Sequence, residues 1–246
     1  MSEIVEIIDI KEWKPNKPLA LVGMPGPGLV GPIAGSHLVD TFKMSQVAAV
    51  HTNLIPTVSV FYGGLLKHPM RIYANEEGTL VVIVSEIAIS TDAMFTLARE
   101  LVKWLIDKGC ETLVSLDSVD IKNIRKRDVI FGVAEEDAMK DIERKGIVRL
   151  SKGYVGGFTG ALMNECIVRP EIKGLGLLVP ALGDLPDPSA AANLLKSVGT
   201  IFSLEIPVEK LIKEGKVLQE KLRDLLSKVQ EQKKKEVAKP AAAYFT

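Results

Sequence analysis

Short apolar, often β-branched runs alternate with helical patterns from residue 11 to about residue 207 of this chain. The candidate strands are Leu19–Val22, Val47–Val50, Leu80–Ser85, Thr112–Leu116 and Leu175–Val179. Most of these runs are apolar at every position, which is typical of strands buried on both faces of a sheet. Strands that alternate with helices are joined by right-handed crossovers. The sequence therefore predicts the α/β fold class, with a mainly parallel or mixed central sheet flanked by helices.

Helical patterns lie between these strands. Leu29–Phe42 separates the first two strands, and Ala93–Lys108 separates the third from the fourth. The second of these has an apolar stripe at helical spacing, and Gly109 is placed to end it. A further helix is predicted over Glu135–Lys145, and before it we expect the charged stretch Asp117–Asp128 to form an exposed connection. The last helix of this region, over 190–198, is entered through an Asp-Pro-Ser sequence, and no domain boundary is evident inside 1–206.

After Pro207 the pattern changes to one amphipathic helix followed by a charged segment. The seam positions of this helix are Leu211, Gly215, Leu218, Leu222, Leu225 and Val229. Such a seam packs either on its own domain or against another subunit, and the spacing alone leaves both open. The segment 231–239 is too polar to bury a core, so we expect a flexible tail over 231–246. The chain thus divides into an α/β core at 1–206, a helix at 207–230 and this tail.

Charge and composition exclude several classes of protein. Thirty-one basic residues balance thirty-one acidic ones, whereas nucleic-acid binders usually carry a basic excess. Two cysteines, Cys110 and Cys166, cannot form a disulfide framework or a cysteine-rich zinc site. No apolar run approaches the roughly 20 residues that span a bilayer, and the N-terminus lacks a signal-peptide pattern. We therefore expect a soluble cytoplasmic protein that binds no metal, nucleic acid or membrane.

The most prominent local motif is the glycine-rich run Gly23–Gly31, between the first predicted strand and the first helix. Gly26, Gly28 and Gly31 fit the G-x-G-x-x-G spacing, in which backbone amides cradle a pyrophosphate. An acidic residue should follow about 20 residues later, but the sequence there is Val-His-Thr. Two prolines in the run also remove amide donors. We interpret the run as a tight turn with close helix packing, and predict no cofactor.

Evidence for catalysis is weak. The sequence has no Walker A pattern, no G-x-S-x-G elbow, no H-E-x-x-H and no paired C-x-x-C, and its three histidines lack ligand spacing. Carboxylates do follow predicted strands, where ligands of open α/β sheets bind: Glu86, Asp117, Asp120, Asp184 and Asp187. Loops are polar in any case, and a nucleophile or base pair is missing. We predict no catalytic residues, with one alternative: a phosphorylase-like enzyme that holds phosphate in Gly23–Gly31 and contacts substrate through Glu86 or Asp184.

Three motifs occur together in this chain: Gly23–Gly31 with the following Pro-Ile-Ala, Gly156–Gly160, and Leu185–Ala191. Together they resemble the proteasome assembly chaperone family in its archaeal form, over Leu19 to Val198. The resemblance implies an α/β fold akin to that of nucleoside phosphorylases, used without catalysis. It also implies a homo-oligomer, such as a tetramer, that docks on the α-ring of the proteasome core particle.

The same resemblance implies a role for the end of the chain. Proteasome partners of this kind dock through a C-terminal tripeptide of a hydrophobic residue, Tyr and any residue. This chain ends Tyr244-Phe245-Thr246, so Phe245 occupies the expected Tyr position, or the motif lies one residue earlier. Physically, an aromatic tip can fill an apolar slot while the terminal carboxylate pairs with a lysine. The expected function is an ATP-independent binding factor, assembler or activator; a tail without a role is the alternative.

Overall fold

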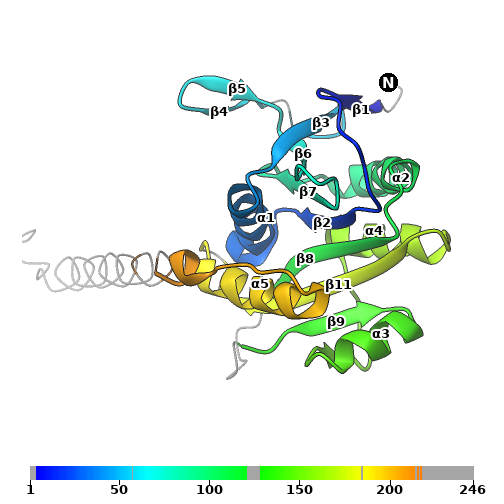
Figure 1. Cartoon of the computed structure of the whole chain (residues 1–246), viewed down its shortest axis with the longest axis vertical. Helices are drawn as coiled ribbons and strands as arrows, with labels where there is room; N and C mark the ends of the chain where they lie inside the picture. Colours follow the sequence, from blue (N-terminus) through cyan, green and yellow to red (C-terminus); the bar gives the residue numbers. More distant parts are fainter. Residues whose placement is uncertain are drawn as a thin grey trace, which may run out of the picture.

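One mixed sheet between two layers of helices forms the body of the protein (Figure 1). A computed structural model describes residues 4–56, 58–120, 128–183, 185–213, 215 and 217. The main sheet of this described part has nine strands in the order β1-β3-β6-β7-β2-β8-β11-β9-β10. They are β1 (Val5–Asp9), β2 (Leu19–Gly23), β3 (Ser45–Thr52), β6 (Met70–Ala74), β7 (Leu80–Ser85), β8 (Thr112–Asp120), β9 (Phe131–Ala134), β10 (Val148–Arg149) and β11 (Lys173–Ala181).

Parallel strands form the centre of the sheet, and an antiparallel pair follows on each side of this centre. β7, β2, β8 and β11 are parallel neighbours. On one side β6, β3 and β1 follow with antiparallel pairing, and on the other side β9 is antiparallel to β11. The central strands are buried almost throughout, as their uniformly apolar sequences indicate. The predicted α/β class with a mixed sheet is confirmed.

The helices bury two apolar clusters, one on each face of the sheet. α1 (Val30–Thr41) packs on α5 (Pro188–Phe202) over one face, and α2 (Thr91–Asp107) packs on α4 (Gly157–Ile167) over the other. The short α3 (Glu136–Glu143) covers β9 and β10 and adds its buried residues to the α1–α5 cluster. The predicted stripe of α2 is buried, and Gly109 follows that helix at φ 76°, as its position at the helix end requires.

One expected connection is in fact strand at its beginning. β8 extends through Asp120, so the first four residues of the charged stretch 117–128 pair with β11 instead of forming an exposed loop. Polar residues are tolerated there because Ser118 donates to a backbone carbonyl and Asp117 accepts hydrogen bonds. Hydropathy alone did not reveal these partners, so this prediction was wrong for Asp117–Asp120.

A separate hairpin of β4 (Val60–Tyr62) and β5 (Leu65–Lys67) forms its own two-stranded sheet. Figure 1 shows it projecting from the edge of the body near β3. Its turn is Gly63-Gly64, and both glycines have positive φ, 57° and 80°. Two consecutive residues of this kind give the tight turn that matches the twist of a hairpin.

The C-terminal helix begins on the body of the protein. After α5 the chain passes through Pro207, whose carbonyl lies 2.7 Å from Nε2 of His37 in α1. Val208 and Leu211 are buried in the α1–α5 cluster, and Ile212 packs against it. Residues 209–213 are helical, and Val217, the last described residue, is exposed. None of the helices in the described residues is long and apolar enough to cross a membrane.

Candidate functional site

The glycine-rich turn between β2 and α1 allows close contact between backbones. A Cβ on Gly31 would lie 2.4 Å from the carbonyl oxygen of Met24 and 2.8 Å from that of Leu116. A Cβ on Gly23 would lie 2.2 Å from the oxygen of Gly31. These distances leave no room for any other residue. The two glycines at the ends of the turn therefore set how closely α1 approaches β2 and β8.

The middle of the turn bonds to the loop before α5. Gly28, at φ 66°, donates its N–H to the carbonyl of Gly183, and its own carbonyl accepts from the N–H of Asp187 at 2.8 Å. The buried Asp187 carboxylate caps α5 by accepting from Ala190 N at 3.0 Å, and it also accepts from Leu182 N. Two of the three motifs behind the family resemblance, Gly23–Gly31 and Leu185–Ala191, thus form one junction. Glycine is required in the first motif because the chain segments pack closely there.

A crevice opens beside this junction, at the carboxyl ends of β2 and β8. It has a volume of about 480 Å³. Its walls come from the Met24–Pro27 turn, from the end of β8 and from the beginning of α4, where the third motif, Gly156–Gly160, lies. Apolar side chains such as Met94 and Phe158 complete it. Ligands of open α/β sheets bind at this place in the fold.

The polar side chains of the crevice are bonded to one another. Ser115 and Thr159 hydroxyls lie 2.8 Å apart, Thr159 donates to Asp117 Oδ2 at 2.5 Å, and Asp117 Oδ1 accepts from Ser118 N at 2.7 Å. Burial raises the pKa of Asp117, while its two hydrogen bonds oppose that rise. Both carboxylate oxygens therefore already have donors from the chain. The arrangement ties β8 to α4, and Ser118 ties β8 to the turn through the carbonyl of Pro27.

The residues of the phosphorylase-like alternative are not assembled at this crevice. Glu86 lines a second cavity of about 310 Å³, together with Leu29, Tyr62 and Leu211. Asp184 lies outside the described residues. Asp120 lies at the crevice but is exposed. Glu86 thus lies outside the crevice, in a cavity that the glycine-rich run reaches only through Leu29.

Glu86 instead holds the hairpin to the body. Its Oε1 accepts from Arg71 Nη2 and, at 2.9 Å, from the Tyr62 hydroxyl, while Arg71 also donates to Tyr73 at 2.9 Å. Arg71 is almost fully buried; burial lowers its pKa, but Glu86 and Tyr73 outweigh this effect and raise it. Burial and the bond to Glu86 raise the pKa of Tyr62. This cluster was not predicted from the sequence, because an arginine inside a strand gives no signal of its partner.

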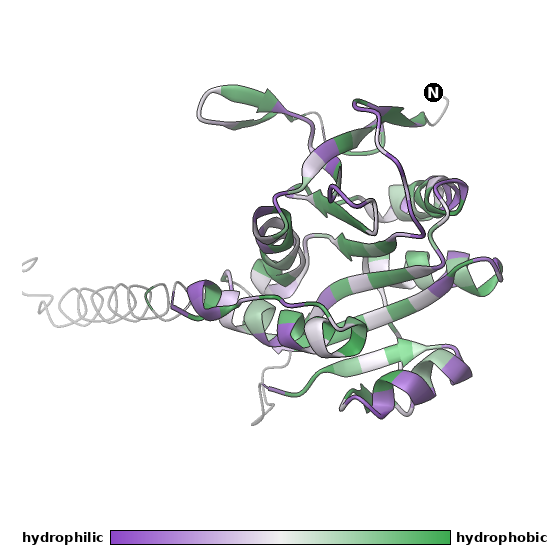
Figure 2. Ribbon diagram, viewed as in Figure 1, coloured by the Kyte–Doolittle hydropathy of each residue, from purple (hydrophilic) through white to green (hydrophobic). Residues whose placement is uncertain are grey.

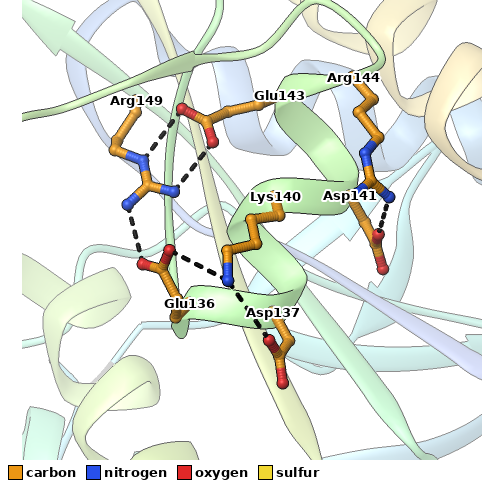
Figure 3. Close-up of polar contacts among 7 residues, drawn as sticks. All are labelled: Glu136, Asp137, Lys140, Asp141, Glu143, Arg144 and Arg149. Atoms are coloured by element: carbon orange, nitrogen blue, oxygen red, sulfur yellow. Dashed lines mark hydrogen bonds and ion pairs between the residues drawn. The ribbon is translucent and has the colours of Figure 1, made fainter.

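Most of the carboxylates around α3 have cationic partners, which lie on α3 or next to it (Figure 3). Arg149 of β10 binds Glu143 through two nitrogens, at 3.0 and 2.9 Å, and Glu136 at 2.9 Å. Lys140 lies 3.5 Å from Glu136. Arg149 lowers the pKa of both glutamates. In the described part of the chain, no group of three or more histidines, cysteines and acidic residues could hold a metal ion.

The predicted docking and oligomerisation residues fall mostly outside the described structure. Leu211 is described and is buried against its own domain. Gly215 is described as well and is buried beside Ser189. The remaining seam residues and the tip lie beyond the described part; they are Leu218, Leu222, Leu225, Val229, Tyr244, Phe245 and Thr246. The structure adds one surface that the sequence reasoning missed, the exposed apolar hairpin. Gly-Gly between two pairs of apolar residues was the signal that could have revealed it.

Comparisons with known proteins give a family match and related sequences. The model of the PAC2 family matches residues 20–226. An uncharacterized protein of Methanocaldococcus jannaschii is 28% identical over 225 residues, which cover 92% of each chain.

Two solved structures from Pyrococcus furiosus are also similar. PbaA, described as an archaeal homolog of proteasome-assembly chaperone, is 28% identical with a TM-score of 0.82, covering 94% of this chain and 95% of its own. PbaB, described as an archaeal proteasome activator, has a TM-score of 0.81 at 20% identity, covering 92% and 99%. At that identity PbaB supports the fold alone. The expected resemblance to archaeal homologues of proteasome assembly chaperones is confirmed.

Proposed function

This chain belongs to the PAC2 family, and we propose that it is a cytoplasmic factor that binds the proteasome core particle without ATP. It acts as an assembly factor or activator and docks on the α-ring through its C-terminal tails. The relative PbaA, described as a homolog of a proteasome-assembly chaperone, supports the choice of partner. The sequence contains no Walker A motif that would supply ATP binding.

The observation that carries this proposal is the fixed root of the C-terminal segment. Val208 and Leu211 are buried in the core, and His37 contacts the carbonyl of Pro207 at 2.7 Å. Beyond this root the sequence continues with an amphipathic pattern, a polar segment at 231–239 and two aromatics at the end. A firm root followed by a soluble spacer and an aromatic tip suits a tail that reaches into a partner's pocket.

Several copies strengthen such docking. One short peptide binds weakly, but linked copies raise the effective concentration and increase avidity by about 10²–10⁴-fold. We therefore propose a homo-oligomer, such as a tetramer, held partly by the seam Leu218, Leu222, Leu225 and Val229. The polar spacer lets tails from an oligomer of one symmetry reach pockets of a ring of another symmetry.

Deletion of Tyr244–Thr246 tests the proposal. We expect the truncated protein to lose at least about ten-fold in co-sedimentation with core particles, because the aromatic anchors supply most of the energy of such a contact. Peptide hydrolysis by the core particle is measured in the same samples. Replacement of Lys239 by Ala, in the spacer and outside the tip, is the control. Unchanged co-sedimentation and hydrolysis after the deletion would reject the role of the tail.

Two variants locate the docking tripeptide. Phe245→Tyr restores the family pattern in the present frame, and deletion of Thr246 alone restores it one residue earlier. The variant that strengthens co-sedimentation identifies the frame in use. If both weaken it, the tip is not read as this tripeptide.

A further inference from the structure

The β4–β5 hairpin presents a concentrated apolar surface. Phe61 and Leu65 are each 67% exposed, Leu66 is 77% exposed and Tyr62 is 53% exposed. Figure 2 shows that much of this hairpin is hydrophobic. The hairpin is separate from the main sheet. Single exposed apolar residues are common, but contiguous apolar patches mark interaction sites. The hairpin is therefore a candidate interface.

The pairing of the two strands assigns these residues to two faces. Phe61 pairs with Leu66, and Tyr62 pairs with Leu65, so each pair shares one face and the two pairs lie on opposite faces. The Tyr62 hydroxyl donates to Glu86, and the Arg71 guanidinium lies 5.8 Å from the Tyr62 ring centre. The Tyr62 side chain thus contacts the body, while Leu65 on the same face is 67% exposed. The opposite face, formed by Phe61 and Leu66, is called the Phe61–Leu66 face.

The hairpin gains little stability from the main sheet. Its strands pair with each other and form a sheet separate from the large one. An isolated two-stranded ribbon is only marginally stable in water and needs a further layer against its apolar face. The bond from Tyr62 to Glu86 holds the ribbon next to its Gly63-Gly64 turn and leaves the Phe61–Leu66 face exposed. A partner that covers this face would supply the missing layer.

The sequence of the same chain contains a matching apolar surface. Leu218, Leu222, Leu225 and Val229 form a seam at helical spacing with charged residues between them. The root of this helix starts in the cavity of about 310 Å³ that Lys210 and Leu211 line together with Tyr62. The helix root and the Tyr62 face of the hairpin are therefore neighbours on the body.

This placement favours a neighbouring copy as the source of the helix. A chain's own helix begins on the Tyr62 side of the ribbon, whereas the Phe61–Leu66 face lies on the other side. A contact between a helix of one copy and a hairpin of the next uses two different surfaces, and such contacts form a ring when the rotation between copies closes. We propose that the Phe61–Leu66 face binds the Leu218–Val229 segment of a neighbouring copy. This inference rests on one part of the proposed function, the homo-oligomer, and does not require that the tails dock on the core particle.

Cross-linking tests the contact directly. One variant carries Leu66→Cys and a second, with a different tag, carries Leu222→Cys; the two are co-expressed and oxidised. The native Cys110 and Cys166 are buried, and burial raises the pKa of each to about 12, so they contribute little background. We expect a disulfide-linked pair that contains both tags. Glu220→Cys, two residues from the seam position, replaces Leu222→Cys as the control and should give several-fold less product.

Other results overturn the inference. If both cysteines in a single chain form a link within that chain and the co-expressed pair forms none between chains, the helix occupies its own hairpin. If no link forms in either arrangement, the hairpin has another occupant, such as a second hairpin or the core particle.

The native mass gives an independent measurement. We expect the Phe61→Ser, Leu66→Ser double variant to shift from the oligomer toward the subunit mass of 26.8 kDa. Lys67→Ser, on the same ribbon but on the Tyr62 side, is the matched control. Circular dichroism checks that the variant is folded. An unchanged mass of the folded double variant rejects the hairpin contact, whereas deletion of Tyr244–Thr246 with unchanged mass and unchanged core-particle binding rejects the proposed function alone.

Discussion

The junction of the glycine turn with the loop before α5 and the β4–β5 hairpin use glycine for opposite purposes. At the junction, a Cβ on Gly31 would meet backbone atoms at 2.4 Å. In the hairpin, a Cβ on Gly63 or Gly64 would meet nothing within 4 Å among the described atoms, and positive φ alone explains the glycines. The first site is fixed by close packing of backbones, whereas the second is fixed by the conformation of a turn.

This difference separates a region that serves internal packing, the glycine-rich turn, from a region that is exposed to partners, the hairpin. The most prominent motif of the sequence uses its polar groups within the protein. Gly28 exchanges backbone hydrogen bonds with Gly183 and Asp187, and the Asp187 carboxylate caps α5. The inconspicuous hairpin leaves Phe61 and Leu66 exposed. In this fold the glycine motif packs the body together, and the hairpin leaves an exposed apolar surface at its edge.

Gly31→Ala should produce the largest loss of stability. The new methyl group collides with the backbone oxygens of Met24 and Leu116, which cannot move without shifting β2 or β8. We expect the free energy of unfolding to fall by about 3 kcal/mol, measured by urea denaturation. Gly153→Ala, where a Cβ meets nothing within 4 Å, should change it by no more than about 0.5 kcal/mol. Equal effects of the two substitutions would contradict the packing role of the turn.

Asp187→Ala should have the next largest effect. It removes the cap of α5 and leaves the N–H of Leu182 without its acceptor in a buried place. We expect a loss of about 2 kcal/mol in the free energy of unfolding. Asp187→Asn keeps an oxygen for the cap and should lose about half as much. A neutral Asp187→Ala would show that the junction is held by packing alone.

Asp117 should make stability depend on pH. Burial raises its pKa above the ordinary value of 3.8, so the folded state keeps the proton where the unfolded state has lost it. Stability contributed at this site therefore falls as pH rises from about 3.8 through the raised pKa. The free energy of unfolding of Asp117→Asn minus that of the natural protein should increase over this window and then level off. Asp120→Asn makes the same charge change at an exposed neighbour and is the control; a flat difference for Asp117→Asn would contradict the expected shift.

Leu66→Ser should have the smallest effect on the stability of the subunit. Leu66 is 77% exposed, so its truncation removes little buried surface. At a dilution that separates subunits, we expect the free energy of unfolding to change by no more than about 0.5 kcal/mol, measured by urea denaturation. A loss comparable to that of Asp187→Ala would mean that the hairpin packs on its own body instead of serving a partner.

The layered architecture could be predicted because local patterns and tertiary environment agree. The five predicted strands coincide with β2, β3, β7, β8 and β11, and the stripe of α2 is the face that the structure buries. Asp187 was expected at the entry of α5, and its carboxylate does cap that helix. The local sequence of a uniformly apolar strand or of a capped amphipathic helix is enough to predict which of its residues are buried.

The remaining features depend on partners distant in sequence. β6 contains Arg71, which is tolerated because Glu86 lies across the adjacent strand end. β9 and β10 are short, β9 is only partly buried and β10 is exposed, and α3 packs against both. The end of β8 is polar and is a strand because Thr159 and the turn supply its hydrogen bonds. Such elements are stabilised by tertiary contacts that no local pattern reports.

The position of β11 has a consequence for how the chain reaches this structure. It is formed by residues 173–181, yet it lies between β8 and β9, which are made earlier during synthesis. In the described sheet, β9 and β10 join the other strands through β11. In a nascent chain that ends before residue 173, β11 is absent, so the edges of β8 and β9 that pair with it remain without a partner strand. Closure of the body must wait until nearly three quarters of the protein has left the ribosome, and unpaired edges are prone to aggregation until then.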